Sequence, residues 1–490
     1  MVLITFAVLS TVYAQTDDPL EKEMQAAQAA LEEAIPRAAK DTTRPMYHFR
    51  PPARWMNDIC GTIYYKGYHH IFHQSNPYLD DEYGWGWGHA RSKDLVHWEY
   101  LPFALPPMKH RGERRCNSGC VTLDGNGRPM IFYTFVPTTG AKRSQWAAAP
   151  LDDDLIRWRR VGDGPLMEAG KNGVPQDVPG GWSDPYVFKA DGRTFVTFKA
   201  CGGLVCEATN KTLTEWKYVG RLEGVVGECP NVFKLQDKWV IIRSTDPISY
   251  VTGQLVLDGN DIRFNVDGPA AVMDFGYGKN LPAGRQRISR GLYGTNTYLD
   301  PEGRRIMFGW ISGFKTGRGW NGCMSLPRVL TLDRGGRLIQ TPAPELKELR
   351  ERHTHVTGIE LNNAFKRIDG AGGKQLELIA EFIPGDAEAF GLKLRSSGDG
   401  SRAVTLRCSG KTLDVAGTEV PVERAEEVNS LKLHVFLDRS VMEVFINGGR
   451  QAVTRVEYPG EDDLDVGVFA EGGKATVKSL DAWQMKNVYK

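Results

Sequence analysis

The sequence predicts an all-β protein, namely a five-bladed β-propeller followed by a C-terminal β-sandwich. Five segments each combine a turn containing Gly or a polar pair with runs of aromatic and β-branched residues, a pattern typical of a β-hairpin. They recur at intervals that suit the blades of a propeller, and a sandwich with long loops is the alternative. The five segments are residues 64–74, 123–135, 188–200, 233–244 and 299–312.

The composition supports this fold class and argues against several functions. The chain has 54 Gly, 12 Trp and 10% aromatic residues, and Gly-containing turns between aromatic runs are typical of β-proteins. A hydrophobic fraction of 41% excludes a largely disordered chain. With 61 Lys+Arg against 60 Asp+Glu, the formal net charge is +1. We therefore expect neither a nucleic acid nor a membrane surface as a partner.

Two segments precede the repeats. Residues 1–14 are mostly apolar and stand before a polar run, which is typical of the remnant of a secretory signal peptide, with a buried strand as the alternative. We therefore expect a secreted or periplasmic protein. Residues 15–44 are predicted to be an N-terminal helical extension, because residues 19–40 place their apolar side chains on one stripe of a helix.

The repeats predict a propeller domain over residues 45–342, and the pattern changes near residue 343. A charged, helix-like stretch follows at 345–353. Beyond it, apolar and polar residues alternate with period two, which predicts a β-sandwich over residues 343–490 that supports the propeller structurally. The predicted strands include residues 374–383, 431–446 and 463–472.

The cysteines and histidines do not predict a metal site. The eight cysteines lack the paired C-x-x-C spacing of structural zinc sites. Cys116 with Cys120, and Cys201 with Cys206, are close enough in sequence for local disulfides, which spacing alone does not establish. The histidine-rich segment 69–73 has no carboxylate close by in the sequence. We expect neither a metal nor an organic cofactor.

Three acids near the starts of predicted blades are the candidate catalytic groups. Asp58 lies in WMND before the first hairpin, Asp184 in WSDP before the third and Glu228 in GECP before the fourth. A propeller gathers one inner strand from every blade around a single axis, so these acids can meet in one pocket. Trp stacks on sugar rings, and Asn and Asp bind hydroxyls, so the motifs predict a carbohydrate site.

At these motifs the chain resembles glycoside hydrolase family 32, the family of invertases, inulinases and levanases. Its members carry W-M-N-D-P-N-G, R-D-P and E-C-P motifs on a five-bladed propeller followed by a β-sandwich. The corresponding segments here are WMNDICG (55–61), WSDP (182–185) and GECP (227–230). Further matches are HQSNP (73–77), WGWGHARSKDLVHWE (85–99), NSGC (117–120), GWNGCMSLPRVL (319–330), QTPAPEL (340–346) and DRSVMEVFING (438–448). The resemblance covers residues 45–490.

The resemblance implies one role for each acid. Asp58 would be the nucleophile that attacks the anomeric C2 of a fructofuranosyl unit. Glu228 would be the general acid that protonates the leaving oxygen and then the base that activates water. Asp184 would hold ring hydroxyls and stabilise the transition state. Because that transition state resembles an oxocarbenium ion, one carboxylate must stay ionised while another keeps its proton near neutral pH.

The resemblance also implies contacts with the substrate. Asn57, Gln74 and Ser118 occupy positions where the family has hydroxyl-binding groups, and Trp85 matches a Trp that lines the pocket. Asn117 replaces the Phe that usually precedes the Ser, so we expect a more polar wall there.

Two departures from the family motifs bear on the substrate. Ile59 and Cys60 replace the Pro-Asn that follows the nucleophile, so the turn that presents Asp58 loses a rigid residue. Ser183 replaces the Arg of R-D-P, which removes a cation near Asp184. We therefore expect the pKa of Asp184 to be higher than that of an Asp paired with Arg, and a change in the hydroxyls bound at Ser183.

Together these features predict a secreted retaining β-fructosidase that cleaves terminal β-D-fructofuranosyl units from sucrose or fructans such as inulin and levan. One alternative is a glycosidase of different furanoside specificity, or a fructosyltransferase, on the same fold. Another is a sugar-binding protein without turnover, which would have no need of a proton donor at Glu228.

Overall fold

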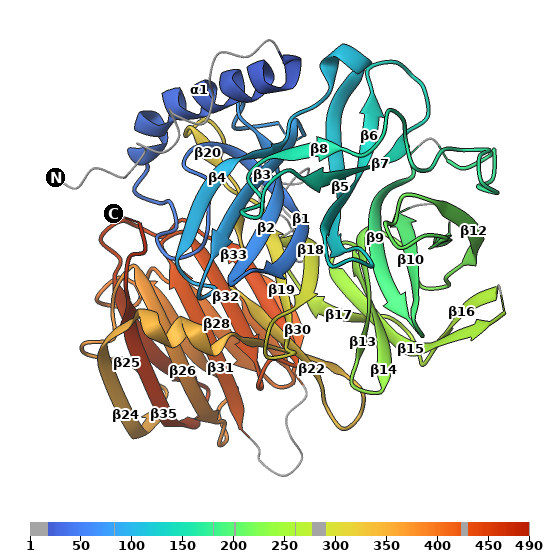
Figure 1. Ribbon diagram of the computed structural model, residues 1–490. Coiled ribbons are helices and arrows are strands. Elements are labelled where there is room, and N and C mark those ends of the chain that lie inside the picture. The colour runs from blue at the N-terminus through green and yellow to red at the C-terminus, as the bar shows by residue number, and fades with distance from the viewer. Residues whose placement is uncertain are drawn as a thin grey trace.

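The computed structural model describes residues 18–82, 84–179, 181–199, 202–259, 261–276, 291–422 and 430–489. They form a five-bladed propeller and a two-sheet sandwich, which confirms the predicted fold class (Figure 1). The expected signal-peptide remnant at 1–14 and Cys201 of the Cys201–Cys206 pair lie outside the described residues. Within them, no helix has both the length and the apolar character needed to cross a bilayer.

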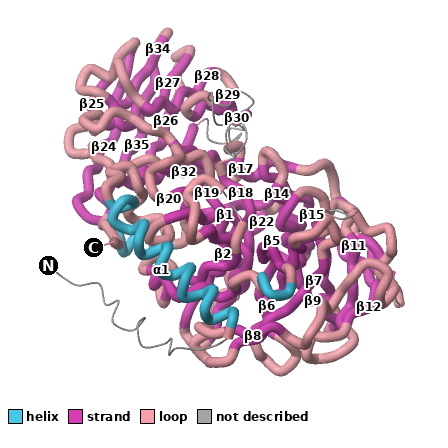
Figure 2. Tube along the Cα trace, turned by 90° about the horizontal axis from the view of Figure 1, so that it is seen from above, coloured by secondary structure: helices cyan, strands magenta, loops and turns pink. Residues whose placement is uncertain are grey.

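The predicted N-terminal helix is α1 (Pro19–Ala39). Asp18 caps it, since its side chain accepts a hydrogen bond from the backbone N of Leu20 at 2.8 Å. The helix lies along the outside of the propeller (Figure 2). Its apolar stripe is buried there, where Ala27 and Leu31 share a cluster with Trp320. The helix is therefore held by burial of one face.

Each predicted hairpin forms part of one blade. Blade one contains β1 (Arg54–Tyr65), β2 (Tyr68–Asn76), β3 (Gly86–Ser92), β4 (Trp98–Leu105) and the added β20 (Trp320–Asn321). Blade two contains β5 (Glu113–Leu123), β6 (Pro129–Pro137), β7 (Ser144–Pro150) and β8 (Trp158–Arg160). Blade three contains β9 (Ser183–Ala190), β10 (Arg193–Lys199), β11 (Leu204–Ala208) and β12 (Trp216–Arg221).

The last two blades each have one strand more than blades two and three. Blade four contains β13 (Glu228–Leu235), β14 (Lys238–Ser244), β15 (Ile248–Asp258), β16 (Asp261–Val266) and β17 (Ala271–Asp274). Blade five contains β18 (Leu292–Leu299), β19 (Arg305–Ile311), β21 (Cys323–Met324), β22 (Arg328–Leu332) and β23 (Leu338–Pro342). The described residues also include the short 3₁₀ helices η2 (Lys109–Arg111) and η3 (Pro344–Leu349).

The inner strands close into a ring. β1, β5, β9, β13 and β18 each contact the next, and β18 contacts β1. The ring is locked by β20, which pairs in parallel with β1 through Arg54–Trp320 and Trp55–Asn321. Residues from all five blades can therefore reach one axial site.

Turn chemistry sets the register of the first hairpin. Tyr65 pairs with Tyr68 across a turn made by Lys66 and Gly67, whose φ angles are 46° and 88°. Positive φ at both positions is what a two-residue type I′ turn requires. The polar-Gly pair in the sequence is therefore the direct cause of this hairpin.

The C-terminal sandwich has two antiparallel sheets around its own core. One sheet contains β24 (Arg350–Asn362), β26 (Gln375–Ile383), β31 (Leu431–Asp438), β32 (Val441–Ile446), β33 (Gln451–Val456) and β35 (Lys474–Met485). The other contains β25 (Phe365–Arg367), β27 (Ala389–Ser396), β28 (Val404–Ser409), β29 (Thr412–Val415), β30 (Thr418–Pro421) and β34 (Asp465–Glu471). Leu378, Leu392, Val444 and Val468 are fully buried between them.

The helix expected at 345–353 is wrong for much of its length. Only the short η3 is helical, and Arg350 already begins β24, which pairs with β35. β24 is an edge strand, so charged residues such as Glu351 and Arg352 remain exposed there. Pairing with β35 therefore outweighs the local helical preference.

The local disulfide considered for Cys116 and Cys120 is also absent, since both thiols are free. The two residues lie four apart on β5, which separates their Cα atoms by about 13 Å in an extended strand. A disulfide requires a Cα separation below about 7 Å. The Cys120 sulfur instead accepts a hydrogen bond from the backbone N of Val187 at 3.2 Å.

A buried ion cluster joins the propeller to the sandwich. Arg328 of β22 is fully buried, and its guanidinium donates to Asp274 of β17 at 3.0 Å and to Glu443 of β32 at 3.1 Å. Gln340 and Thr454 accept further hydrogen bonds from it at 2.7 and 2.8 Å. Next to this cluster, β17 pairs in parallel with β33, so blade four and one sandwich sheet form a continuous sheet.

The same cluster fixes the segment that enters blade one. The other oxygen of Glu443 accepts from Leu326 N at 2.7 Å and contacts His48 Nε2 at 3.1 Å. His48 Nδ1 lies 2.9 Å from Asp438. Burial opposes protonation of His48, but these two carboxylates outweigh it and raise its pKa to about 9. Glu443 is thus a structural residue.

Loss of the Arg328 charge should destabilise the protein strongly. In Arg328→Met, Asp274 and Glu443 stay buried without their cation, so we expect the free energy of unfolding to fall by about 3–5 kcal/mol. Calorimetric unfolding measures this loss. The control is Arg367→Met, which removes ion pairs with Asp369 and Asp465 from a half-exposed side chain and should leave the stability nearly unchanged. Similar losses in the two variants would contradict the assigned role of the cluster.

Candidate active site

The three predicted acids lie on three inner strands of the propeller. Asp58 is on β1, Asp184 on β9 and Glu228 begins β13. In the ring, β9 contacts β13 directly, and β5 contacts both β1 and β9. Acids that are far apart in the sequence are therefore brought to one end of the propeller axis.

Asp58 is surrounded by donors that suit an ionised carboxylate. Ser118 Oγ, from β5, donates to Asp58 Oδ2 at 2.8 Å, and the Cys229 sulfur lies 3.6 Å from the same oxygen. Burial and the nearby charge of Glu228 raise the pKa of Asp58, while hydrogen bonds from Ser118, Asn57 and Cys229 act in the opposite direction. These donors favour the charged form of this carboxylate.

Asp184 is more deeply buried and is held by its backbone. Its N–H donates to Thr134 Oγ1 at 3.1 Å, and its Oδ2 accepts from Cys229 N at 3.2 Å. Burial raises its pKa to about 6; Lys199 opposes this rise, and the charges of Glu228 and Asp58 add to it. Asp184 is thus coupled electrostatically to the whole group.

Cys229 links two of the acids. Its N–H donates a hydrogen bond to Asp184. Its sulfur lies 3.6 Å from Asp58 Oδ2 and 4.0 Å from Asp184 Oδ2. Both Cys229 and Asp184 have left-handed backbone conformations, with φ of 43° and 57°. Such conformations are costly for residues other than Gly and persist where the surroundings enforce them. Asn231 holds this turn by donating to Cys229 O at 3.1 Å.

Glu228 occupies the more open side of the group, with 34% of its side chain exposed. Tyr293 Oη donates to one carboxylate oxygen at 3.0 Å, and Lys199 Nζ donates to the other. Tyr293 itself packs with Trp55 and Trp310 in a small aromatic cluster. Glu228 is therefore held in one orientation while it still reaches solvent, as proton exchange requires.

Gly294 of β18 allows the fifth inner strand to approach Asp58. Its φ is 51°, and a Cβ added there would lie 2.5 Å from Asp58 Oδ1 and 2.8 Å from Asp58 Cα. The contact involves backbone, so an added methyl group would have to displace Asp58.

Three of the six predicted substrate contacts, Asn57, Ser118 and Ser183, lie next to the acids. Asn57 accepts from Trp55 Nε1 at 2.8 Å, and Ser118 bonds Asp58. Ser183 is fully buried beside Asp184, and its Oγ has no hydrogen-bond partner in the described chain. Two of the other three predicted residues are Gln74, which donates to Cys116 O at 2.8 Å, and Asn117, which is half-buried on β5.

Trp85 is placed differently. Its indole N donates to Glu23 of α1 at 3.2 Å, and its ring packs with Ala27 and Leu31 of that helix. No contact joins it to the three acids among the described residues. The structure thus shows Trp85 as an anchor for the N-terminal helix, and its contact with substrate stays a prediction.

Ser183 brings no cation to Asp184, but a cation reaches this acid from the neighbouring strand. Lys199 at the end of β10 pairs in register with Ser183 and acts on Asp184. Part of the signal was available in the sequence, since counting outward from the turn of the predicted hairpin at 188–200 places Lys199 opposite Asp184, and an irregularity after Thr197 shifts it by one residue to Ser183. Tyr293 and Gly294 come from another blade, and nothing in the sequence linked them to the acids.

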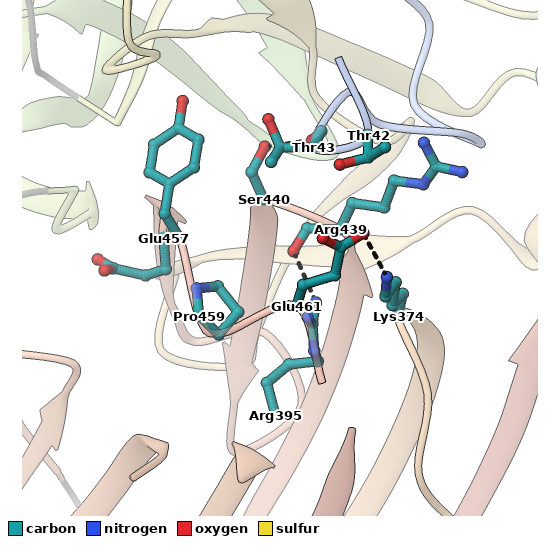
Figure 3. A pocket seen from close by; sticks show the side chains of 10 residues that line it. Thr42, Thr43, Lys374, Arg395, Arg439, Ser440, Glu457, Pro459 and Glu461 are labelled. Atoms are coloured by element: carbon teal, nitrogen blue, oxygen red, sulfur yellow. Dashed lines mark hydrogen bonds and ion pairs between the residues drawn. The ribbon is translucent and has the colours of Figure 1, made fainter. Parts of the chain in front are cut away.

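A separate pocket of about 110 Å³ lies between the N-terminal segment and the sandwich (Figure 3). Lys374 and Glu461 form an ion pair at 3.6 Å on its wall, and Arg395 donates to the backbone of Arg439. None of the three acids lines this pocket. It is a feature of the domain boundary and not of the carboxylate site.

Both parts of the chain match one known family. Residues 48–342 match the glycosyl hydrolases family 32 N-terminal domain, and residues 345–484 match the family 32 C-terminal domain. These two matches together cover nearly all of the propeller and the sandwich.

Individual relatives agree with this match. A levanase of Bacillus subtilis (strain 168) is 28% identical over 516 residues, which cover 91% of this chain and 71% of the relative. A sucrose-6-phosphate hydrolase of Escherichia coli is 27% identical, with 95% and 99% of the two chains covered. The fold also resembles that of fructan 1-exohydrolase IIa from Cichorium intybus, with a TM-score of 0.77, 22% identity and coverage of 91% and 98%. The chain therefore belongs to glycosyl hydrolase family 32, whose relatives act on fructosides such as sucrose or levan.

Proposed function

We propose that the protein is a retaining β-fructosidase that releases terminal β-D-fructofuranosyl units from sucrose or fructans. The observation that carries this proposal is the division of labour among the three acids. Asp58 is buried with donors from Ser118 and Cys229, whereas Glu228 lies on the more open side, where Tyr293 and Lys199 hold its two oxygens. A nucleophile and a proton donor with these surroundings are what a retaining glycosidase needs.

In the first step, Asp58 Oδ attacks C2 of the fructosyl unit. The bond from C2 to the leaving oxygen breaks as Glu228 transfers its proton to that oxygen. The products are a covalent fructosyl-Asp58 ester, a free alcohol and an ionised Glu228. Ser118 and Cys229 orient Asp58 for this attack.

In the second step, Glu228 takes a proton from water while the water oxygen attacks C2. The ester bond breaks, and fructose leaves with net retention of configuration. Asp184 lies beside both reacting carboxylates and, when ionised, stabilises positive charge that develops on the ring.

The direct test is product analysis with sucrose, inulin and levan, separated by chromatography. Free fructose from any of them supports the proposal, and the ratio of rates gives the specificity. Reaction in aqueous methanol tests the stereochemistry, since a retaining enzyme forms methyl β-D-fructofuranoside. Transfer to a second sugar in place of water would identify a fructosyltransferase, and binding without any product would identify a sugar-binding protein.

Two variants separate the roles of Asp58 and Glu228. Asp58→Asn should lower kcat by at least about 10³-fold on every substrate, because it removes the nucleophile. Glu228→Gln should lower kcat on sucrose by about 10²–10⁴-fold but much less on p-nitrophenyl β-D-fructofuranoside, whose leaving group needs little protonation. Steady-state and burst kinetics measure both.

The control for these variants is Glu302→Gln, an exposed acid in the turn between β18 and β19, which should leave both substrates unaffected. Full activity in Asp58→Asn would exclude the mechanism. An equal loss on both substrates in Glu228→Gln would exclude Glu228 as the acid.

Gly294→Ala should inactivate the enzyme while leaving it folded. The added methyl group displaces Asp58, and a misplacement near 1 Å costs about 10²-fold in rate. Gly303→Ala is a matched control, since Gly303 also has a positive φ, 76°, but no neighbour within 4 Å of its Cβ. Hydrolysis rates and circular dichroism of the two variants check this prediction, which fails if they lose the same activity.

A further inference from the structure

Lys199 reaches the active site although no motif marks it. It ends β10, and its Cα pairs with that of Ser183 at the start of β9. Its amino group donates to Oε1 of Glu228. The side chains of Lys199 and Glu228 are 28% and 34% exposed, so their ion pair lies at the rim of the site. Such a pair is screened less by salt than a pair on the open surface.

The charge of Lys199 acts on a second acid. Three carboxylates share this site, and each makes ionisation of the others harder. Burial raises the pKa of Asp184, and Lys199 is the cation that opposes the rise. Burial also disfavours the charged form of Lys199, yet the charges of Asp184 and Glu228 hold its pKa above the usual value. Lys199 is therefore a permanent positive charge between two acids.

We propose that Lys199 is the positioning residue for Glu228 and supplies, from β10, the positive charge that Ser183 does not supply from β9. It holds one Glu228 oxygen while Tyr293 holds the other. When Glu228 gives its proton to the leaving oxygen, the resulting anion is neutralised by Lys199. When Glu228 later takes a proton from water, it becomes neutral and its attraction to Lys199 weakens. This inference rests on the proposed function and concerns how one cation sets the position and protonation of the acids in that site.

The test compares charge removal with charge retention. Lys199→Met keeps the length of the side chain and removes the charge, so both limbs of the pH profile of kcat/KM should move upward by about one pH unit. The alkaline limb moves because Glu228 then gives up its proton less readily, and the acidic limb moves because Asp184 loses its cation. At the optimum kcat should fall about 10-fold. Lys199→Arg should retain the wild-type profile.

Lys189→Met is the control, because Lys189 is an exposed lysine on the same blade that donates only to Leu123 O. A Lys199→Met profile that is lower but unshifted would show a merely structural role and overturn the inference. Measurements on the wild-type enzyme separate the role of Lys199 from the proposed function. Fructose release by the wild type supports the proposed function whatever the result for Lys199→Met, and absence of release excludes both proposals.

The sandwich carries an independent group of metal-binding side chains. His353 and His355 lie two residues apart on the edge strand β24, and Asp481 lies opposite His355 on β35. His353 Nε2 and His355 Nδ1 are 2.8 and 2.7 Å from the same oxygen, Asp481 Oδ1. All three ligand atoms are within 4.8 Å of one another. Ligands of tetrahedral zinc are about 3.4 Å apart, so small rotations suffice.

The surroundings of this group suit a cation. His353 stacks on Trp483 with ring centroids 4.6 Å apart and planes 3° apart, which limits rotation of its imidazole. The three side chains are partly exposed, so water can occupy a fourth position. We infer that they form a site for a divalent transition-metal ion such as Zn²⁺, which ties β24 to β35.

Calorimetric titration of the full chain with ZnCl₂ tests this second inference. We expect one equivalent to bind and the thermal midpoint to rise, with both effects lost in His355→Ala and in Asp481→Asn. His110→Ala, which removes an exposed histidine elsewhere, should retain both. Absence of binding to wild type, or equal binding in His355→Ala and wild type, would overturn it.

Discussion

Mutual repulsion among three carboxylates is the constraint around which the active site is arranged. Two unit charges 4 Å apart interact by about 4 kcal/mol at an effective dielectric constant near 20. The chain offsets this with donors aimed at Asp58, with a backbone N–H aimed at Asp184 and with a lysine beside Glu228. The left-handed conformations of Asp184 and Cys229 belong to the same arrangement, since they direct these groups toward each other.

The sandwich supports the blade that carries Glu228. Blade four contains Glu228 on its inner strand, and its outer strand β17 continues into the sandwich sheet through β33. Asp274 at the end of β17 is bound to Arg328, which also binds Glu443 of the sandwich. A shift between the domains would therefore move the strands of blade four. This link between the domains gives a reason for burying the charged Arg328, Asp274 and Glu443, although removing charges from water is unfavourable.

Local patterns made the fold predictable, and contacts between blades made part of the site unpredictable. The five hairpins follow from turn residues and β-branched runs within short segments, and the three acids stand in recognisable motifs. The helix expected at 345–353 fails because β24 pairs with β35, more than a hundred residues away in the sequence. Tyr293 and Gly294 join the site only through closure of the ring. The position of Lys199 near Asp184 could be predicted from the sequence, because Lys199 lies in the same hairpin as Ser183 and Asp184.

Pairing of β1 with β20 sets the order in which the site can appear during synthesis. The strand that carries Asp58 leaves the ribosome early, and its partner Trp320 leaves near the end of the propeller. Until then, blade one has an unpaired edge and Asp58 lacks the neighbour that Gly294 provides. During much of their synthesis, nascent chains therefore expose a strand edge whose unpaired backbone groups can pair with other chains. The group of residues around Asp58 is complete only after the fifth blade is made.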